Sequence, residues 1–176
     1  MEKKNILLTF LDKIQLDWKC IVFWSACLEL YWIESNQFHD VDLVCDNSFF
    51  TELYLFLKVK QKGESDDYFD SLKNIQLQEI NKKWFGKSQR IWFELLWLEF
   101  ECFLELDKDK WIFSPYFENM DECTNNYKWN FYLLKPEYLK QSYLKIAKYE
   151  LISLKEDISI LPKIEQRVER IGKLWI

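Results

Sequence analysis

The chain has 176 residues and a formal net charge of −5, and it is 49% hydrophobic, 18% aromatic and 30% charged. This composition excludes an intrinsically disordered chain, because the apolar surface is large enough to offset the entropy lost on ordering. The 3 glycines and 3 prolines also exclude collagen-like and linker-like sequences. The length predicts a single globular domain over residues 1–176.

Apolar residues recur at helical spacing in residues 4–16 and predict an amphipathic helix. Residues 18–33 are apolar on nearly every side of a helix and predict a buried helix. Apolar and polar residues alternate briefly over residues 38–45 and predict a short strand. Good N-cap residues precede a third helix, predicted over residues 49–60. A helix is also expected over residues 67–83, because its first turn is acidic and its last turn basic.

Residues 90–106 fit two patterns, since their glutamates recur at helical spacing while their second half alternates like a strand. The polar connector after residue 106 and the strand-favouring residues beyond it favour a hairpin. We expect residues 97–106 to pair with residues 110–116, and residues 129–133 to add another strand.

Pro136 and Pro162 suit the first turns of two further helices, the second of which ends at Gly172. Together these elements predict a predominantly α-helical α+β fold. It would hold about five to six helices and a small antiparallel hairpin or sheet near residues 97–133.

No export or membrane segment is recognised in the sequence. The apolar run near the start breaks at Asp12 and Lys13, and the longest strongly apolar stretch, residues 20–28, is too short to span a bilayer. The 5 cysteines are odd in number and irregularly spaced, which favours reduced thiols over a disulfide framework. We therefore expect a cytoplasmic protein without membrane contact.

The charge is unevenly distributed along the chain. Residues 61–127 carry 14 acidic and 8 basic side chains, and residues 128–176 carry 6 acidic and 10 basic ones. The acidic middle segment argues against direct nucleic-acid binding, which normally needs an arginine-rich basic surface. The basic C-terminal segment leaves two alternatives, a solvated helix face or a surface that contacts phosphates.

Motifs of several enzyme classes are absent. A single histidine excludes paired-histidine metal sites, and glycines only at positions 63, 86 and 172 exclude phosphate loops and dinucleotide-binding motifs. Neither a nucleophile elbow nor a Cys-x-x-Cys pair is present. The sequence therefore predicts no cofactor and a protein that is not an enzyme.

One group of residues keeps a chemical role open. His39, Asp40, Asp42, Cys45 and Asp46 lie within eight residues, and an imidazole with carboxylates can hold a divalent cation or act as a general base. The alternative is a polar loop and strand whose aspartates face water. Cys45 is not expected to act as a nucleophile, because its neighbours are apolar.

A run of carboxylates leads to the main functional hypothesis. On a strand, Glu99, Glu101 and Glu105 would share one face. That face could be merely solvated, could catalyse glycoside hydrolysis, or could dock a basic protein with neighbouring aromatic residues as anchors.

We favour docking, and specifically an immunity-type inhibitor that blocks the cleft of a basic, nuclease-like toxin domain. The residues expected to contact the partner are Glu99, Glu101, Glu105, Asp107, Asp109, Trp111, Tyr116 and Phe117. Two alternatives stay open: a metal-dependent hydrolase centred on His39, Asp40 and Asp42, and a structural subunit of an obligate assembly. No metal site is assigned under the favoured hypothesis, and the oligomeric state does not follow from the sequence.

Overall fold

The computed structural model describes residues 2–31, 38–63, 67–82, 86–106, 114–153 and 161–172. Helices and strands alternate irregularly along these residues. The elements in chain order are α1 (Lys3–Lys13), β1 (Cys20–Val22), α2 (Trp24–Leu30), β2 (Asp40–Cys45), α3 (Asn47–Gln61), a 3₁₀ turn (Phe69–Ser71), β3 (Lys73–Lys82), β4 (Gly86–Leu95), β5 (Leu98–Glu105), α4 (Ser114–Glu118), α5 (Met120–Cys123), β6 (Thr124–Lys128), β7 (Phe131–Leu134), α6 (Pro136–Ser153) and α7 (Leu161–Gly172).

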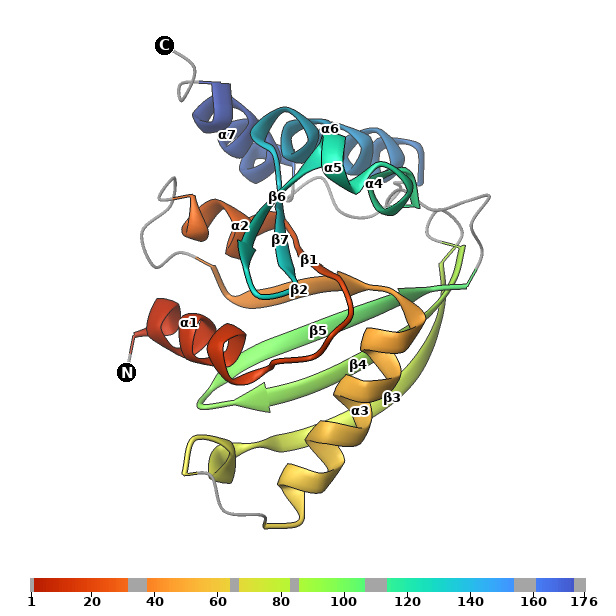
Figure 1. The fold of residues 1–176 in the computed structure, drawn as a ribbon. Helices are drawn as coiled ribbons and strands as arrows, with labels where there is room; N and C mark the ends of the chain where they lie inside the picture. The colour runs from red at the N-terminus through yellow and green to blue at the C-terminus, as the bar shows by residue number, and fades with distance from the viewer. Residues whose placement is uncertain are drawn as a thin grey trace.

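The described strands form one mixed, seven-stranded sheet in the order β3-β4-β5-β2-β1-β7-β6 (Figure 1). The pairs β2–β5 and β1–β7 are parallel, and the other neighbouring pairs are antiparallel. The expectation of a predominantly helical fold with a small hairpin near residues 97–133 is therefore wrong. The fold is α+β, and it is organised around an extensive sheet.

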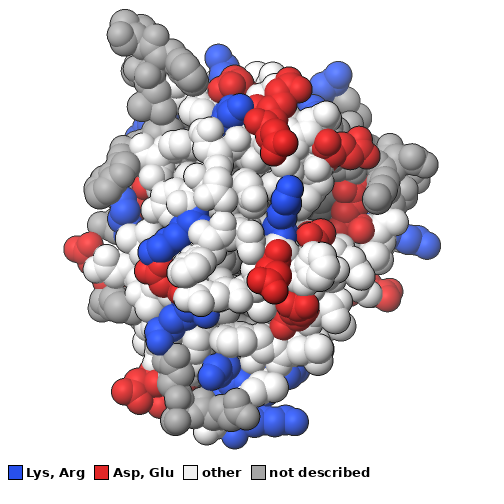
Figure 2. All heavy atoms as spheres, in the orientation of Figure 1, with Lys and Arg blue, Asp and Glu red and all other residues white. Residues whose placement is uncertain are grey.

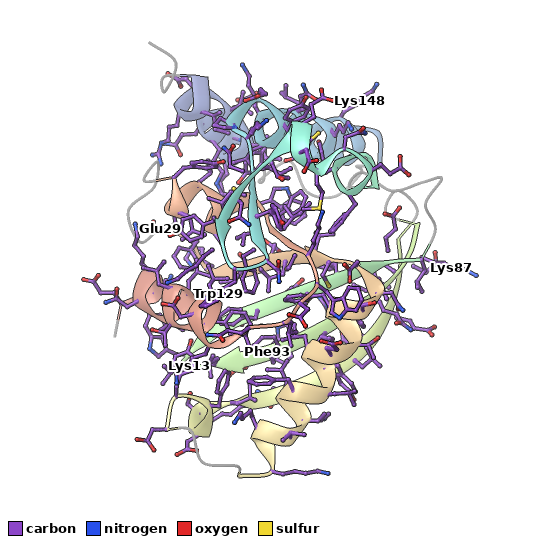
Figure 3. The ribbon with its side chains drawn as sticks, in the orientation of Figure 1. Lys13, Glu29, Lys87, Phe93, Trp129 and Lys148 are labelled. Carbon is purple, nitrogen blue, oxygen red and sulfur yellow. The ribbon has the colours of Figure 1, made fainter. Side chains whose placement is uncertain are left out.

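Helices α1 and α3 cover one face of this sheet (Figure 1). The ring of Phe10 in α1 lies 4.5 Å from that of Phe100 in β5, and Phe93 of β4 stacks on Phe100 with ring centroids 5.0 Å apart (Figure 3). Phe49 of α3 meets Phe131 of β7 edge to face at 5.6 Å. These rings are fully buried, so alternate residues of the central strands build the core.

Residues 90–106 are extended, but their pairing differs from the expected hairpin. β5 pairs with β4 and β2, residues 114–116 begin α4, and residues 107–113 lie outside the described residues. The turn between β4 and β5 is the pair Leu96 and Trp97, with φ of 49° and 67°. Two-residue turns of this shape normally use Asn-Gly, so Leu96-Trp97 carried no hairpin signal in the sequence.

The helix expected over residues 67–83 is also wrong, because β3 occupies most of that segment. Exposed glutamine, glutamate and lysine residues favour helices. The acidic start and basic end of the segment also suited the helix dipole, and the helix was expected for that reason. Pairing with β4 outweighs these local preferences. The segment lacks a regular alternation of burial, since Ile75 is 8% exposed whereas Leu77, two residues further along the strand, is 47% exposed.

Several expected elements are confirmed: α1, α3, α6, α7 and the strands β2 and β7 lie where the patterns placed them. Asp46 caps α3, its side chain accepting a hydrogen bond of 2.7 Å from the Phe49 N–H. The long buried helix expected over residues 18–33 is only partly correct, because β1 comes first and α2 begins at Trp24. The chain turns sharply there, with a φ of 47° at Trp24.

Candidate functional site

Four carboxylates project from two adjacent parallel strands. Asp40 of β2 lies opposite Glu99 of β5, and Asp42 lies opposite Glu101. The residues between them, such as Val41 and Phe100, are fully buried toward α1 and α3. Because successive strand residues point to opposite faces, the four carboxylates share the other face of the sheet. We call Asp40, Asp42, Glu99 and Glu101 the carboxylate face.

Asp42 is the least exposed member of the carboxylate face, at 6%. Burial raises its pKa well above the usual value, and the nearby charges of Asp40 and Glu101 raise the pKa further, while Arg167 and Arg90 act in the opposite direction. Within the described residues its carboxylate makes no hydrogen bond or ion pair. The main-chain oxygen of Asp42 accepts a 2.9 Å hydrogen bond from the Phe23 N–H.

Two arginines flank the carboxylates. Arg90 of β4 donates to Glu101 Oε1 at 2.8 Å and also to the Gln78 side chain, while its Nε is buried without a hydrogen-bond partner in the described part of the chain. Arg167 of α7 lies over the ring of Tyr143, 5.7 Å from the centroid. The site therefore combines carboxylates with guanidinium groups, the side chains best suited to binding phosphate.

The three-ligand centre hypothesised at His39, Asp40 and Asp42 is not formed. His39 is exposed just before β2, and Asp40 is half-buried. Within the described residues, no group of three or more His, Cys, Asp or Glu side chains is arranged to hold a metal ion. Any cation on this face would need ligands from outside the protein as well.

The expected docking residues are scattered. Glu99 is exposed, whereas Glu101 is half-buried and already paired with Arg90. Tyr116, which was expected to anchor a partner, is only 2% exposed and packs 6.1 Å from the ring of Phe23. The remaining expected residues that fall outside the described part of the chain are Asp107, Asp109 and Trp111.

Two expected docking residues do meet, at the carboxyl ends of β2 and β5. Glu105 and Phe117 line a hollow of about 230 Å³ together with Asp46 and Glu118. The lining comes from residues 44–47, 104–105 and 117–118, and we call it the strand-end hollow. In the space-filling view, acidic side chains gather toward the upper right, near α4 and α5, and the rest of that side mixes both charges (Figure 2).

The five cysteines are buried and reduced. Burial raises the pKa of Cys45, and so does its contact with Cys102, whose sulfur lies 3.1 Å away. A thiol in this state is a poor nucleophile, so the structure agrees with the inert role expected for Cys45.

Sequence patterns missed Arg90, Arg167 and Trp24. No sequence pattern placed the two arginines beside β2, because only the sheet pairing and the packing of α7 bring them there. Trp24, the first residue of α2, has a positive φ and follows Phe23, whose N–H donates to the main-chain oxygen of Asp42. Such backbone strain in a bulky residue is costly and often found beside functional sites.

No protein-family model matches the chain, and neither a curated protein nor a solved structure is significantly similar to it. Among the helices described, none combines the length and the apolar character needed to cross a membrane.

Proposed function

We propose that the carboxylate face binds a divalent cation together with a phosphate-bearing ligand and supports hydrolysis or transfer at that phosphate. The observation that carries this proposal is Asp42, a buried carboxylate whose side chain makes no hydrogen bond or ion pair among the described residues and whose pKa the charges of Asp40 and Glu101 help to raise. Strongly perturbed carboxylates of this kind are concentrated at functional sites. A small cation can reach a buried carboxylate that a partner protein's side chain cannot approach.

The ligand set favours magnesium-like chemistry. Mg²⁺ is usually held by one or two protein carboxylates, several waters and the phosphates of the substrate. No group of three such ligands is found among the described residues, so waters and the phosphates of the substrate would supply the remaining ligands. Arg90 and Arg167 add positive charge beside the carboxylates. A bound phosphate needs this positive charge, whereas a surface that docks a basic protein does not.

The chemistry would follow the general course of metal-assisted phosphate reactions. A bound cation would stabilise negative charge on the phosphoryl oxygens, and this would favour attack of a water oxygen on phosphorus with loss of a proton to solvent and departure of the leaving oxygen. Asp42 and Asp40 would hold the cation, and the guanidinium groups would orient the phosphate and offset its charge.

Binding of Mn²⁺ and ATP, followed by thermal unfolding, tests this proposal. With the ligands at a hundredfold excess over their Kd, the Tm should rise by about 5 °C or more. Asp42→Asn, which removes the charge and keeps the shape, should abolish the rise. Glu79→Gln, at an exposed carboxylate of β3, is the matched control and should keep it. An equal rise in the parent and in Asp42→Asn, or none at millimolar Mn²⁺ and ATP, would refute the site.

A second candidate function is the expected cytoplasmic, non-enzymatic inhibitor of a basic toxin domain. The observation that favours it is the strand-end hollow, which brings together Glu105 and Phe117, a carboxylate and an aromatic ring expected to contact the partner. Reduced cysteines suit a cytoplasmic location. The contact surface would then be this hollow, with exposed Glu99 steering the approach of the partner.

A further inference from the structure

We infer that the strand-end hollow binds an arginine side chain of a protein partner. This inference names the ligand of the second candidate function and is independent of the proposed metal site. The hollow lies at the carboxyl ends of β2 and β5, whereas the carboxylate face begins at the opposite end of β2 with Asp40.

The size and floor of the hollow suit a long side chain. Its volume of about 230 Å³ is small for a cofactor, and sites of 300 Å³ or more are usual for drug-sized ligands. The apolar part of its lining comes from Val44, Cys45 and Leu104, which are 2%, 3% and 6% exposed. Such a lining can cover the aliphatic stem of an arginine, which buries its methylenes and keeps its charged end near polar groups.

The rim supplies charge complementary to a guanidinium. Carboxylates come from three different elements: Asp46 before α3, Glu105 at the end of β5 and Glu118 in α4. Asp46 also accepts the hydrogen bond that caps α3, so its position is fixed. A planar guanidinium with five N–H groups can pair with two such carboxylates at once, and the resulting bonds are stronger than those between neutral groups.

Phe117 adds a preference for arginine. Its half-buried ring lines the hollow beside Glu118. Guanidinium groups stack on aromatic rings and are more weakly hydrated than ammonium groups. Transferring an arginine side chain from water into the hollow therefore costs less desolvation free energy than transferring a lysine. The nearby Lys87 side chain points outward from this end of the sheet (Figure 3).

The test is an NMR titration of the full chain with the end-blocked peptide Ala-Ala-Arg-Ala-Ala. The matched control is the same peptide with citrulline, which has the shape of arginine without its charge. We expect amide shifts confined to residues 44–47, 104–105 and 117–118, and at least tenfold weaker binding of the citrulline peptide. Equal binding of the two peptides, or amide shifts in other parts of the chain, would overturn the inference. The absence of any binding at a peptide concentration of about 20 mM, near the weakest affinity that can be measured, would overturn it as well.

Variants separate this site from the metal site. Glu105→Gln and Glu118→Gln should each weaken the binding of the arginine peptide about tenfold, because each variant loses a charge-assisted hydrogen bond to the guanidinium. Phe117→Leu should weaken it less, and Glu79→Gln should leave it unchanged. All four variants should keep the response to Mn²⁺ and ATP, so failure of one proposal does not imply failure of the other. If neither glutamine variant altered peptide binding, the hollow would not be the binding site.

Discussion

Asp42 gives the clearest prediction for a single residue. Its pKa is raised in the folded protein, mainly by burial, so folding favours the protonated form. The carboxyl therefore supports stability below its unfolded pKa of about 4, and that support is lost as the pH rises through the folded pKa.

Asp42→Asn should raise the Tm at pH 8, because it removes an ionised group that is costly to bury. The gain should shrink as the pH falls toward 4, where the parent carboxyl is protonated as well. Thermal unfolding followed by circular dichroism between pH 4 and 8 would measure this. A gain that does not change with pH would show that folding does not raise the pKa of Asp42.

The turn between β4 and β5 gives a prediction for an element. Both turn residues, Leu96 and Trp97, have positive φ, and Trp97 is 60% exposed, so its ring buries little area. A non-glycine residue in this conformation costs roughly 1–2 kcal/mol, which glycine does not incur. Trp129 shows the same combination in the turn before β7, with a φ of 52° and 54% exposure (Figure 3).

Trp97→Gly should therefore be more stable than Trp97→Ala by about 1 kcal/mol, because both lose the ring but only glycine relieves the backbone. This order is the reverse of that expected in an ordinary strand, where alanine is preferred. Urea denaturation of the two variants would measure the difference. If alanine were the more stable, the turn would not adopt the left-handed conformation.

The connectivity of the sheet gives a prediction for the whole molecule. β1 lies near the start of the chain but pairs in parallel with β7, joining Cys20 to Phe131. The described core residues also form one continuous cluster that includes Ile6 of α1 and Ile171 of α7. The N-terminal and C-terminal segments therefore share one hydrophobic core, and neither has a core of its own that would let it unfold independently.

The chain should therefore unfold in one cooperative step, as expected for a single domain over residues 1–176. The calorimetric and van't Hoff enthalpies should agree, and the far-ultraviolet and tryptophan signals should change together. A separate early transition of α6 and α7 would contradict this and would divide the chain into two units.

The sequence by itself determined the elements whose signals are local. The helical spacing in α1, the capping residues before α3 and the prolines that open α6 and α7 act within one or two turns, so pattern reading located them. It also determined that the acidic side chains of β5 alternate with buried residues.

Only the tertiary structure decided which strands are neighbours and what their side chains meet. β3 was mistaken for a helix because its pairing with β4 outweighs its own propensity. Asp42 and Glu101 are far apart in the chain, and only the parallel register of β2 and β5 sets them opposite each other. The acidic middle segment was first interpreted as an interface. The fold instead divides its carboxylates between a partly buried carboxylate face and a hollow at the strand ends, because long-range pairing leaves no local signal.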